Sequence, residues 1–144
     1  MEYISEEEFL KQPVEVQKVL IDWWKPSTGD LFIDISKIDS DADIVYCVPI
    51  NNKHFENYNG EIHYKIDSIP LLSEGQLRKC IEDKTGGKVI LTYNLLNNIL
   101  IKVVKGNDIH NNALETICRY PIDRKSNVLN AYWKVACEIA NEMC

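Results

Sequence analysis

The stretch from Pro70 to Val104 reads Pro-Leu-Leu-Ser-Glu-Gly-Gln-Leu-Arg-Lys-Cys-Ile-Glu-Asp-Lys-Thr-Gly-Gly, then Lys-Val-Ile-Leu-Thr-Tyr-Asn-Leu-Leu-Asn-Asn-Ile-Leu-Ile-Lys-Val-Val. Ser73 and Gln76 have the spacing of a capping box, in which two side chains satisfy backbone N–H groups left free in the first helical turn. Gly86 can close the helix in the left-handed conformation, and Lys84 in the last turn complements the helix dipole. We therefore expect a helix between Ser73 and Gly86.

Two runs rich in β-branched and aliphatic residues follow this helix. Apolar side chains alternate in both runs, at Val89, Leu91 and Tyr93 and then at Ile99, Ile101 and Val103. The segment between them, residues 94–98, is short enough for a hairpin loop, so we expect a β-hairpin. This stretch predicts the core of the fold, but it contains no pattern that indicates chemistry.

The N-terminal part predicts two further helices. Ser5 and Glu8 have capping-box spacing, and Pro13 suits the first position of a second helix because it lacks a backbone N–H. An apolar stripe at helical spacing follows, made by Val16, Val19, Leu20 and Trp23. Trp24 lies about 100° around the helix from Trp23, so the two indoles cannot share the same burial.

Short strands are expected after these helices. Leu31, Ile33 and Ile35 share one face of a half-buried strand, and Ile44–Ile50 is an apolar run that Pro49 places at an edge or a strand end. Asn59-Gly60 predicts a type I′ turn. It leads into a strand in which Ile62, Tyr64 and Ile66 share one face.

The C-terminal part predicts a strand and a helix. Leu114–Tyr120 is predicted as a strand, with a helix as the weaker alternative. Pro121–Lys125 is predicted as a turn, and Ser126 is a candidate cap for the last helix. Apolar residues repeat through that helix at Leu129, Tyr132, Trp133, Ala136, Ala140 and Met143. The order of elements predicts an α+β fold, a single domain over residues 1–144 with three main helices covering one face of a largely antiparallel sheet.

Composition bounds the class of protein. With 144 residues the chain can bury about two thirds of its unfolded surface in one core. The N-terminus lacks the basic and apolar regions of a signal peptide, and no apolar run reaches the about 18–20 residues of a membrane span. Five widely spaced cysteines without a C-x-x-C pair are typical of free thiols: Cys47, Cys80, Cys118, Cys137 and Cys144. We expect a cytoplasmic protein without membrane contact.

The net charge of −6 is unevenly distributed. Residues 1–70 contain 14 acidic against 6 basic side chains, whereas residues 71–144 contain 8 against 10. Because binding to a nucleic-acid backbone depends on clustered Lys and Arg, we expect no non-specific nucleic-acid binding. An acidic first half suits a protein partner with a basic surface instead.

The acidic residues of this half are the first candidate site. Asp39, Asp41 and Asp43 alternate as at the start of a calcium-binding loop, but Ile44 and Ile50 stand where such a loop has Gly and Glu. We interpret the segment as a solvated acidic loop. The predicted binding surface consists of Asp30, Asp34, Asp39, Asp41 and Asp43, with Trp24 as an aromatic contact. For Trp24 a second place in the core is the interpretation that we favour over an exposed anchor.

The second candidate site is Arg119, Tyr120 and Arg124, a basic cluster with an aromatic residue. Arginine and tyrosine together can stack on and pair with a nucleotide or a phosphate. A charged turn beside the last helix explains the same residues without a ligand. Cys118 beside Arg119 is open to two interpretations, a thiolate favoured by the positive charge or a cysteine buried in a strand.

The sequence contains no familiar catalytic or metal-binding motif. P-loop, G-x-G-x-x-G and G-x-S-x-G patterns are missing, and His54, His63 and His110 stand at no metal-ligand spacing. We therefore expect no metal, no cofactor and no enzymatic activity. An enzyme would need a cysteine, a histidine and a carboxylate that converge only in the folded chain.

Several motifs resemble a family of small, uncharacterised proteins encoded by phages and prophages of Gram-positive bacteria. They are Glu15-Val-Gln-Lys-Val-Leu, Trp23-Trp-Lys-Pro, Gly29-Asp-Leu, Pro70-Leu-Leu-Ser-Glu-Gly-Gln-Leu-Arg-Lys, Glu82-Asp-Lys-Thr-Gly and Ala131-Tyr-Trp-Lys-Val-Ala. The resemblance covers about half of the chain and leaves out residues 31–69 and 105–125. It brings no catalytic residues; it implies a phage accessory protein that acts in the cytoplasm of the bacterial host.

These observations lead to three hypotheses. The first is a phage-encoded, non-enzymatic interaction protein that inhibits a host factor or an antiviral defence system through its acidic surface. The second is a protein that sequesters a nucleotide or signal molecule near Arg119, Tyr120 and Arg124. The third is an enzyme whose site is not visible in the sequence. Formation of a homodimer is left open.

Overall fold

The computed structural model describes residues 2–37, 41–93, 98–106, 114–122 and 127–143. These residues form four α-helices and three antiparallel sheets, which confirms the predicted α+β class. The strands are divided among three small sheets, whereas the sequence indicated one. The chain groups into two compact units, which we call the N-terminal unit (essentially Tyr3–Leu72) and the C-terminal unit (essentially Ser73–Glu142). The single domain over residues 1–144 stays a prediction.

The C-terminal unit begins with α3 (Glu74–Thr85), which starts and ends as predicted. The Ser73 hydroxyl accepts a hydrogen bond from the Gln76 N–H, and the Gln76 side chain accepts one from the Ser73 N–H. Gly86 closes the helix at a φ of +73° and donates its N–H to the carbonyl of Glu82. Both boundaries depend on side chains within a few residues, which is why local sequence predicts them.

The sheet of this unit consists of β6 (Lys88–Tyr93), β7 (Ile99–Gly106) and β8 (Leu114–Ile122), hydrogen-bonded in that order. The predicted hairpin is confirmed, with Val89 opposite Val103. β8 continues through Pro121, so the predicted turn at this residue is wrong. The hairpin loop expected at residues 94–98 lies outside the described residues at positions 94–97.

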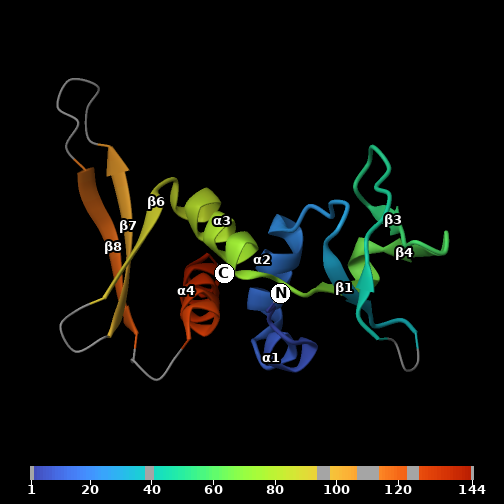
Figure 1. The fold of residues 1–144 in the computed structure, drawn as a ribbon, viewed down its shortest axis with the longest axis horizontal. Helices are drawn as coiled ribbons and strands as arrows, with labels where there is room; N and C mark the ends of the chain where they lie inside the picture. The colour runs from blue at the N-terminus through green and yellow to red at the C-terminus, as the bar shows by residue number, and fades with distance from the viewer. Residues whose placement is uncertain (1, 38–40, 94–97, 107–113, 123–126, 144) are drawn as a thin grey trace. The chain divides into compact units, whose positions relative to one another are not determined.

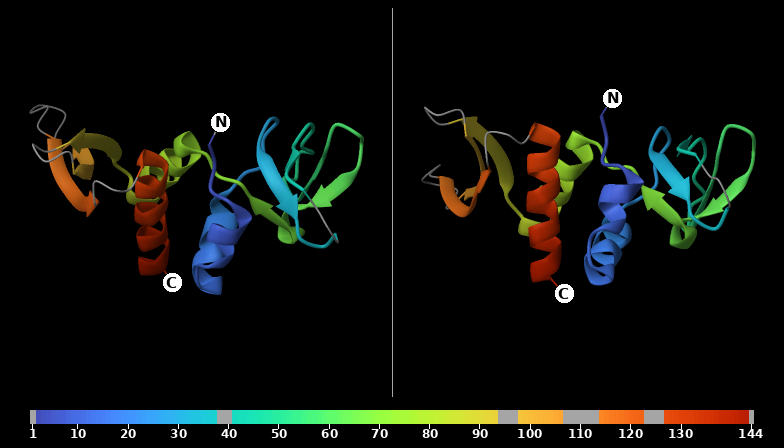
Figure 2. Two further views of the ribbon diagram at one scale, coloured as in Figure 1. Left: turned by 60° about the horizontal axis from the view of Figure 1, so that its bottom comes forward. Right: turned by 90° about the horizontal axis from the view of Figure 1, so that it is seen from below.

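The last helix, α4 (Val128–Glu142), lies beside α3 and packs with it against the sheet (Figures 1 and 2). The side-chain oxygen of Asn127 accepts the N–H of Asn130 at 2.7 Å and so caps the helix. The predicted cap, Ser126, lies outside the described residues. Most of the predicted apolar stripe is buried, but Met143 at its end is exposed.

The N-terminal unit contains α1 (Glu6–Leu10) and α2 (Val14–Trp23). Ser5 caps α1 by accepting the N–H of Glu8, as predicted. Pro13 is the residue just before α2, one position earlier than predicted. Val16 and Leu20 of the predicted stripe are fully buried, whereas Trp23 is only half-buried.

Two small sheets complete this unit (Figure 1). In the first, β1 (Leu31–Asp34) lies between β2 (Asp43–Ile44) and β5 (Ser68–Pro70). In the second, β3 (His54–Glu56) pairs with β4 (Ile62–Tyr64), and a 3-10 helix, η1 (Lys65–Asp67), follows. The rings of Phe32 and Phe55 meet edge to face at a centroid distance of 4.7 Å. The ring of Trp24 meets that of Phe55 in the same way at 5.8 Å.

In β1 and β4 the alternating aliphatic side chains lie on the face that points away from the core. β1 buries Phe32 and Asp34, while Leu31 and Ile33 are only half-buried and Ile35 is exposed. In β4 the buried residue is His63, and its neighbours Ile62 and Tyr64 are about half exposed. Aromatic packing and one buried polar pair, described below, decide which face of each strand turns inward.

The turns and edges of these sheets differ from the sequence interpretation in two places. Gly60 has a φ of +78° but Asn59 has a negative one, so the predicted type I′ turn is wrong. Asn57 closes the loop instead, by accepting the N–H groups of Asn59 and Glu61 on its side-chain oxygen. The apolar run Ile44–Ile50 pairs as a strand only at Ile44, with an isolated bridge at Cys47.

Candidate functional site

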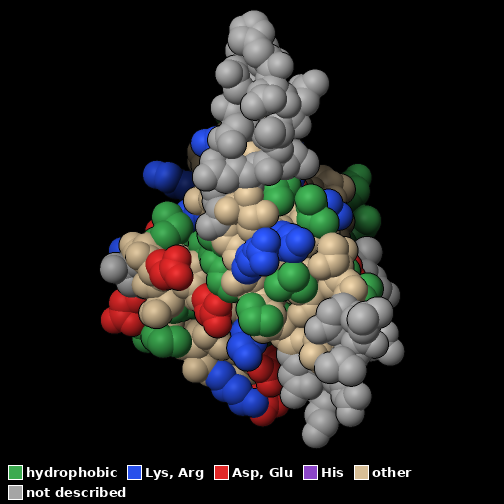
Figure 3. Space-filling model, turned by 90° about the vertical axis from the view of Figure 1, so that its left-hand side faces the viewer, with side chains coloured by type: hydrophobic (Ala, Val, Ile, Leu, Met, Phe, Trp, Pro, Cys, Tyr) green, Lys and Arg blue, Asp and Glu red, His purple; other side chains and the backbone are tan. Residues whose placement is uncertain are grey.

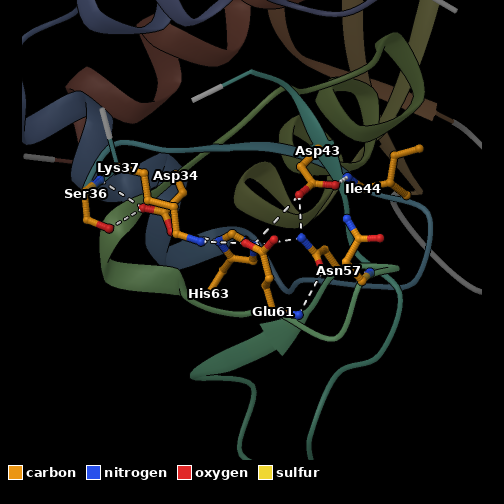
Figure 4. Close-up of polar contacts among 9 residues, drawn as sticks. Asp34, Ser36, Lys37, Asp43, Ile44, Asn57, Glu61 and His63 are labelled. Atoms are coloured by element: carbon orange, nitrogen blue, oxygen red, sulfur yellow. Dashed lines mark hydrogen bonds and ion pairs between the residues drawn. The ribbon is translucent and has the colours of Figure 1, made fainter. Parts of the chain in front are cut away.

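Two polar side chains meet in the interior of the N-terminal unit. Asp34 of β1 is 4% exposed and His63 of β4 is 3% exposed. The Nδ1 atom of His63 lies 2.7 Å from the Oδ2 atom of Asp34 (Figure 4). The ring of Phe32 packs edge-on against the imidazole at a centroid distance of 4.8 Å. Because both groups are shielded from water, their polar atoms need hydrogen-bonding partners within the protein, and this contact supplies one for each.

Asp34 also accepts hydrogen bonds from the backbone N–H and the hydroxyl of Ser36. Burial raises the pKa of this carboxyl, but the hydrogen bonds from Ser36 and His63 outweigh burial, so the pKa lies below its ordinary value. Asp34 is therefore an ionised, hydrogen-bonded carboxylate near neutral pH. It is not a member of an accessible acidic surface, and that part of the sequence prediction is wrong.

The other nitrogen of His63 faces Asn57. The amide nitrogen of Asn57 lies 3.3 Å from His63 Nε2 and donates to Asp43 Oδ2 at 2.9 Å. The amide oxygen of Asn57 is occupied by two backbone N–H groups of its own loop, which fixes the orientation of the amide. Nδ1 of His63 therefore faces the Asp34 carboxylate, and Nε2 faces the Asn57 amide, with Asp43 Oδ2 3.9 Å away.

A small cavity of about 210 Å³ opens beside this cluster. It is lined by Phe32, Asp34, Lys37, Asp41, Ala42, Asp43, Glu61 and His63. Lys37 pairs with Glu61 at 2.9 Å. No group of three or more His, Cys, Asp or Glu residues within the described ranges is placed to hold a metal ion. The contact between Asp34 and His63 joins β1 of the first sheet to β4 of the second.

The remaining acidic candidates and Trp24 take mixed positions. Asp30 accepts the indole N–H of Trp24 at 3.0 Å and the backbone N–H of Ser27. Trp24 is 1% exposed, so it belongs to the core, as we favoured, and it is not available as an exposed contact. Its indole meets the ring of Phe55 edge to face, whereas Trp23 of the helical stripe is only half-buried.

Only part of the predicted acidic surface comes together. Asp41 is exposed and Asp43 is half-buried, and both line the small cavity next to Asp34. Asp39 lies outside the described residues. The sequence did not single out Asn57, Glu61 or Lys37. The one signal for the buried pair was a polar residue inside each apolar run, Asp34 within Leu31–Ile35 and His63 between Ile62 and Tyr64.

The alternative ligand site is not assembled in the described part of the C-terminal unit. Arg119 and Tyr120 are neighbours on β8 and therefore point to opposite faces of the sheet. Arg119 is exposed and lies opposite Lys102. Figure 3 views the molecule from the left-hand side of Figure 1 and shows Lys and Arg side chains near the middle of that face. Burial and a hydrogen bond to Cys118 raise the pKa of Tyr120 on the other face. Arg124 lies outside the described residues.

The cysteines behave as packing residues where they are buried. Cys80 of α3 and Cys137 of α4 are shielded from water, and burial raises the pKa of each thiol to about 12. Cys118 is half-buried on the face of β8 that also carries Tyr120. Cys47 is the exposed thiol among the described cysteines.

A larger depression, which we call the α2–β4 groove, lies on the surface of the N-terminal unit. It has a volume of about 690 Å³ and is lined by Val14, Gln17, Lys18, Ile21, Asp22, Lys53, Tyr64, Lys65 and Ile66. Val14 is 74% exposed and Ile66 is 84% exposed, although both are apolar. Val14 begins α2, and Ile66 belongs to η1. α2 therefore forms one wall of an open apolar groove, and the end of β4 together with η1 forms the other.

The fold and this groove define an α+β protein with an accessible apolar surface on its N-terminal unit. The chain matches no protein-family model, no curated protein and no solved structure. Among the described residues, none of the helices has the length and apolar character needed to cross a membrane.

Proposed function

We propose that this chain is a non-enzymatic interaction protein whose N-terminal unit binds a protein partner in the α2–β4 groove. The resemblance to phage and prophage proteins supports a role inside a bacterial host, as an inhibitor of a host factor or of an antiviral defence system. The acidic residues contribute at the small cavity, where Asp41 and Asp43 remain accessible.

The observation that carries the proposal is the exposure of large apolar side chains on one unit. Most of those exposed among the described residues belong to the N-terminal unit: Tyr3, Leu10, Val14, Ile35, Ile44, Tyr46, Ile50, Tyr58, Ile62, Tyr64 and Ile66. Single exposed apolar residues are ordinary, but a groove lined by several of them is typical of a protein-binding surface. The groove volume is also in the range of binding sites for side chains or small ligands, about 300–1,000 Å³.

The two other hypotheses have less support. An enzyme would need a polar group free to react, and the buried histidine, His63, is engaged on both ring nitrogens. A nucleotide site would need Arg119 and Tyr120 on the same face, and they alternate on a strand. Interaction with a protein needs neither condition.

The experiment is site-specific photo-crosslinking in a Gram-positive host. A photoreactive phenylalanine analogue replaces Tyr64 in the groove or, as a control, Tyr58, an exposed tyrosine that does not line the groove. The crosslinked protein is identified by mass spectrometry and purified, and its affinity for the unmodified chain is measured by calorimetry. We expect a discrete partner crosslinked from position 64 and not from position 58.

The affinity is then compared between two matched variants. Ile66→Ser removes an apolar side chain from the groove, and Ile50→Ser removes the same side chain from an exposed site outside it. Loss of about 2 kcal/mol of binding free energy is expected for Ile66→Ser, typical of a contact residue, and no change for Ile50→Ser. A partner that binds both variants equally, or crosslinks equally at both tyrosines, removes the groove as the binding site.

A further inference from the structure

The α2–β4 groove differs in charge from the unit that carries it. Residues 1–70 contain 6 lysines, and three of them line this groove: Lys18, Lys53 and Lys65. Asp22 is the only acidic residue of the lining. The groove is therefore positively charged, although residues 1–70 contain 14 acidic side chains. A basic groove in an acidic unit selects partners that the unit as a whole would repel.

The lysines of the groove are also available for a partner. Two of the other lysines in residues 1–70 are held in ion pairs, Lys11 with Glu8 and Lys37 with Glu61. No ion pair joins Lys18 or Lys53 to a carboxylate within the described part of the chain. Unlike the paired lysines, these two have no carboxylate partner among those contacts, so an incoming acidic group need not displace one.

Lys65 provides the third positive charge in a partly dry position. Its ammonium lies 3.4 Å from the backbone carbonyl of Asp22, and burial lowers its pKa. An acidic group placed beside a partly desolvated ammonium gains more than it would in bulk water, because the local dielectric constant is lower. The same apolar walls that shield Lys65, including Tyr64 and Ile66, can receive aliphatic side chains.

We infer that the groove binds an acidic amphipathic helix of its protein partner, a conclusion that rests on the function proposed above. The apolar face of the helix covers Val14, Tyr64 and Ile66, and its acidic residues reach Lys18, Lys53 and Lys65 at the rim. Two turns of helix span about 11 Å and present apolar anchors at i, i+3, i+4 and i+7, the usual pattern of helix-in-groove recognition. The sequence alone had indicated a basic partner.

The test uses three synthetic helical peptides with the same leucine stripe and with Glu, Gln or Lys at all polar positions. Binding to the full-length protein is measured by fluorescence anisotropy at low and high salt. We expect the Glu peptide to bind at least about 10-fold more tightly than the Gln peptide, and the advantage to shrink at high salt. The Lys peptide should not bind.

Matched variants locate the site. The double variant Lys18→Glu, Lys53→Glu should lose at least about 10-fold in affinity for the Glu peptide, and Ile66→Ser should also weaken it. Lys134→Glu, an exposed charge reversal in the C-terminal unit, and Ile50→Ser should leave binding unchanged. Circular dichroism of each variant verifies that the fold is retained.

The outcomes separate this inference from the proposed function. If the Gln or Lys peptide binds in the groove as tightly as the Glu peptide, the acidic partner is excluded and the interaction function stands. If none of the peptides binds, the helical partner is excluded, and the crosslinking experiment alone decides the function. Two further results would overturn the inference. If laurate binds in the groove more tightly than the Glu peptide, the groove is a site for a small amphiphile. If the protein forms a dimer in sedimentation equilibrium and Ile66→Ser dissociates it, the groove is occupied by a second copy of the chain.

Discussion

Replacing Asp34 with alanine tests whether the buried polar pair holds the N-terminal unit together. The substitution removes the acceptor for His63 Nδ1 and for two donors of Ser36. Ser36 is exposed, so water can replace its lost bonds, whereas His63 is left with an unsatisfied N–H in the interior. Breaking a buried pair from one side destabilises by about 3–5 kcal/mol, and we expect a loss near the lower value because the Ser36 donors can bond to water.

The pair itself is isolated by two further variants. Asp34→Asn keeps a neutral oxygen for His63, so the loss should fall to about 1.5 kcal/mol. In a His63→Phe background no buried N–H is left unsatisfied, and Asp34→Ala should then lower the unfolding free energy by about 1 kcal/mol. The coupling between the two sites is therefore about 2 kcal/mol. Equal effects of Asp34→Ala in both backgrounds would show that the carboxylate acts without His63.

The pH dependence follows from the lowered pKa of Asp34, which lies below the ordinary value of 3.8. The stabilisation is fully present above the pKa of the unfolded chain and is lost as the pH falls through the pKa of the folded protein. The gap in unfolding free energy between the natural protein and Asp34→Ala should therefore narrow in acid.

The assay is urea unfolding followed by tryptophan fluorescence in a Trp133→Phe background. With Trp133 of the C-terminal unit removed, Trp23 and Trp24 report on the N-terminal unit alone. Measurements near neutral pH and at about pH 3 give the two free-energy differences. A loss below about 1 kcal/mol at neutral pH, or a gap that is unchanged in acid, would refute the reasoning.

Two other predictions concern the C-terminal unit and the thiols. Gly86→Ala should destabilise the protein by about 1–2 kcal/mol, because Gly86 has a φ of +73°. Gly75→Ala should stabilise it by up to about 1 kcal/mol, because Gly75 lies in a helix with open space around its Cα. Thermal unfolding compares the two variants, and equal midpoints for both would contradict the prediction. Iodoacetamide should modify the exposed Cys47 before Cys80 and Cys137, which it should reach only on unfolding because burial raises the pKa of each thiol to about 12. Mass spectrometry gives the order of modification. Early modification of Cys80 or Cys137 would contradict this prediction.

Elements with local causes were predictable. The capping box at Ser73, the left-handed Gly86 and the hairpin after it are confirmed because each depends on residues close in sequence. The α+β class follows from the order of such elements. The candidate site was predicted less well, since Asp34 proved to be buried and paired with His63.

The sequence by itself determined the boundaries of α3, the strand pairing of the C-terminal hairpin and the acidic balance of the N-terminal half. Tertiary structure decided which face of β1 and β4 is buried, because a period of two allows either face, and the aromatic packing of Phe32 together with the meeting of Asp34 with His63 selects one. It also decided the groove, since Lys18 and Lys65 come from elements 47 residues apart in the sequence. Their shared positive charge appears only when α2 and η1 lie side by side.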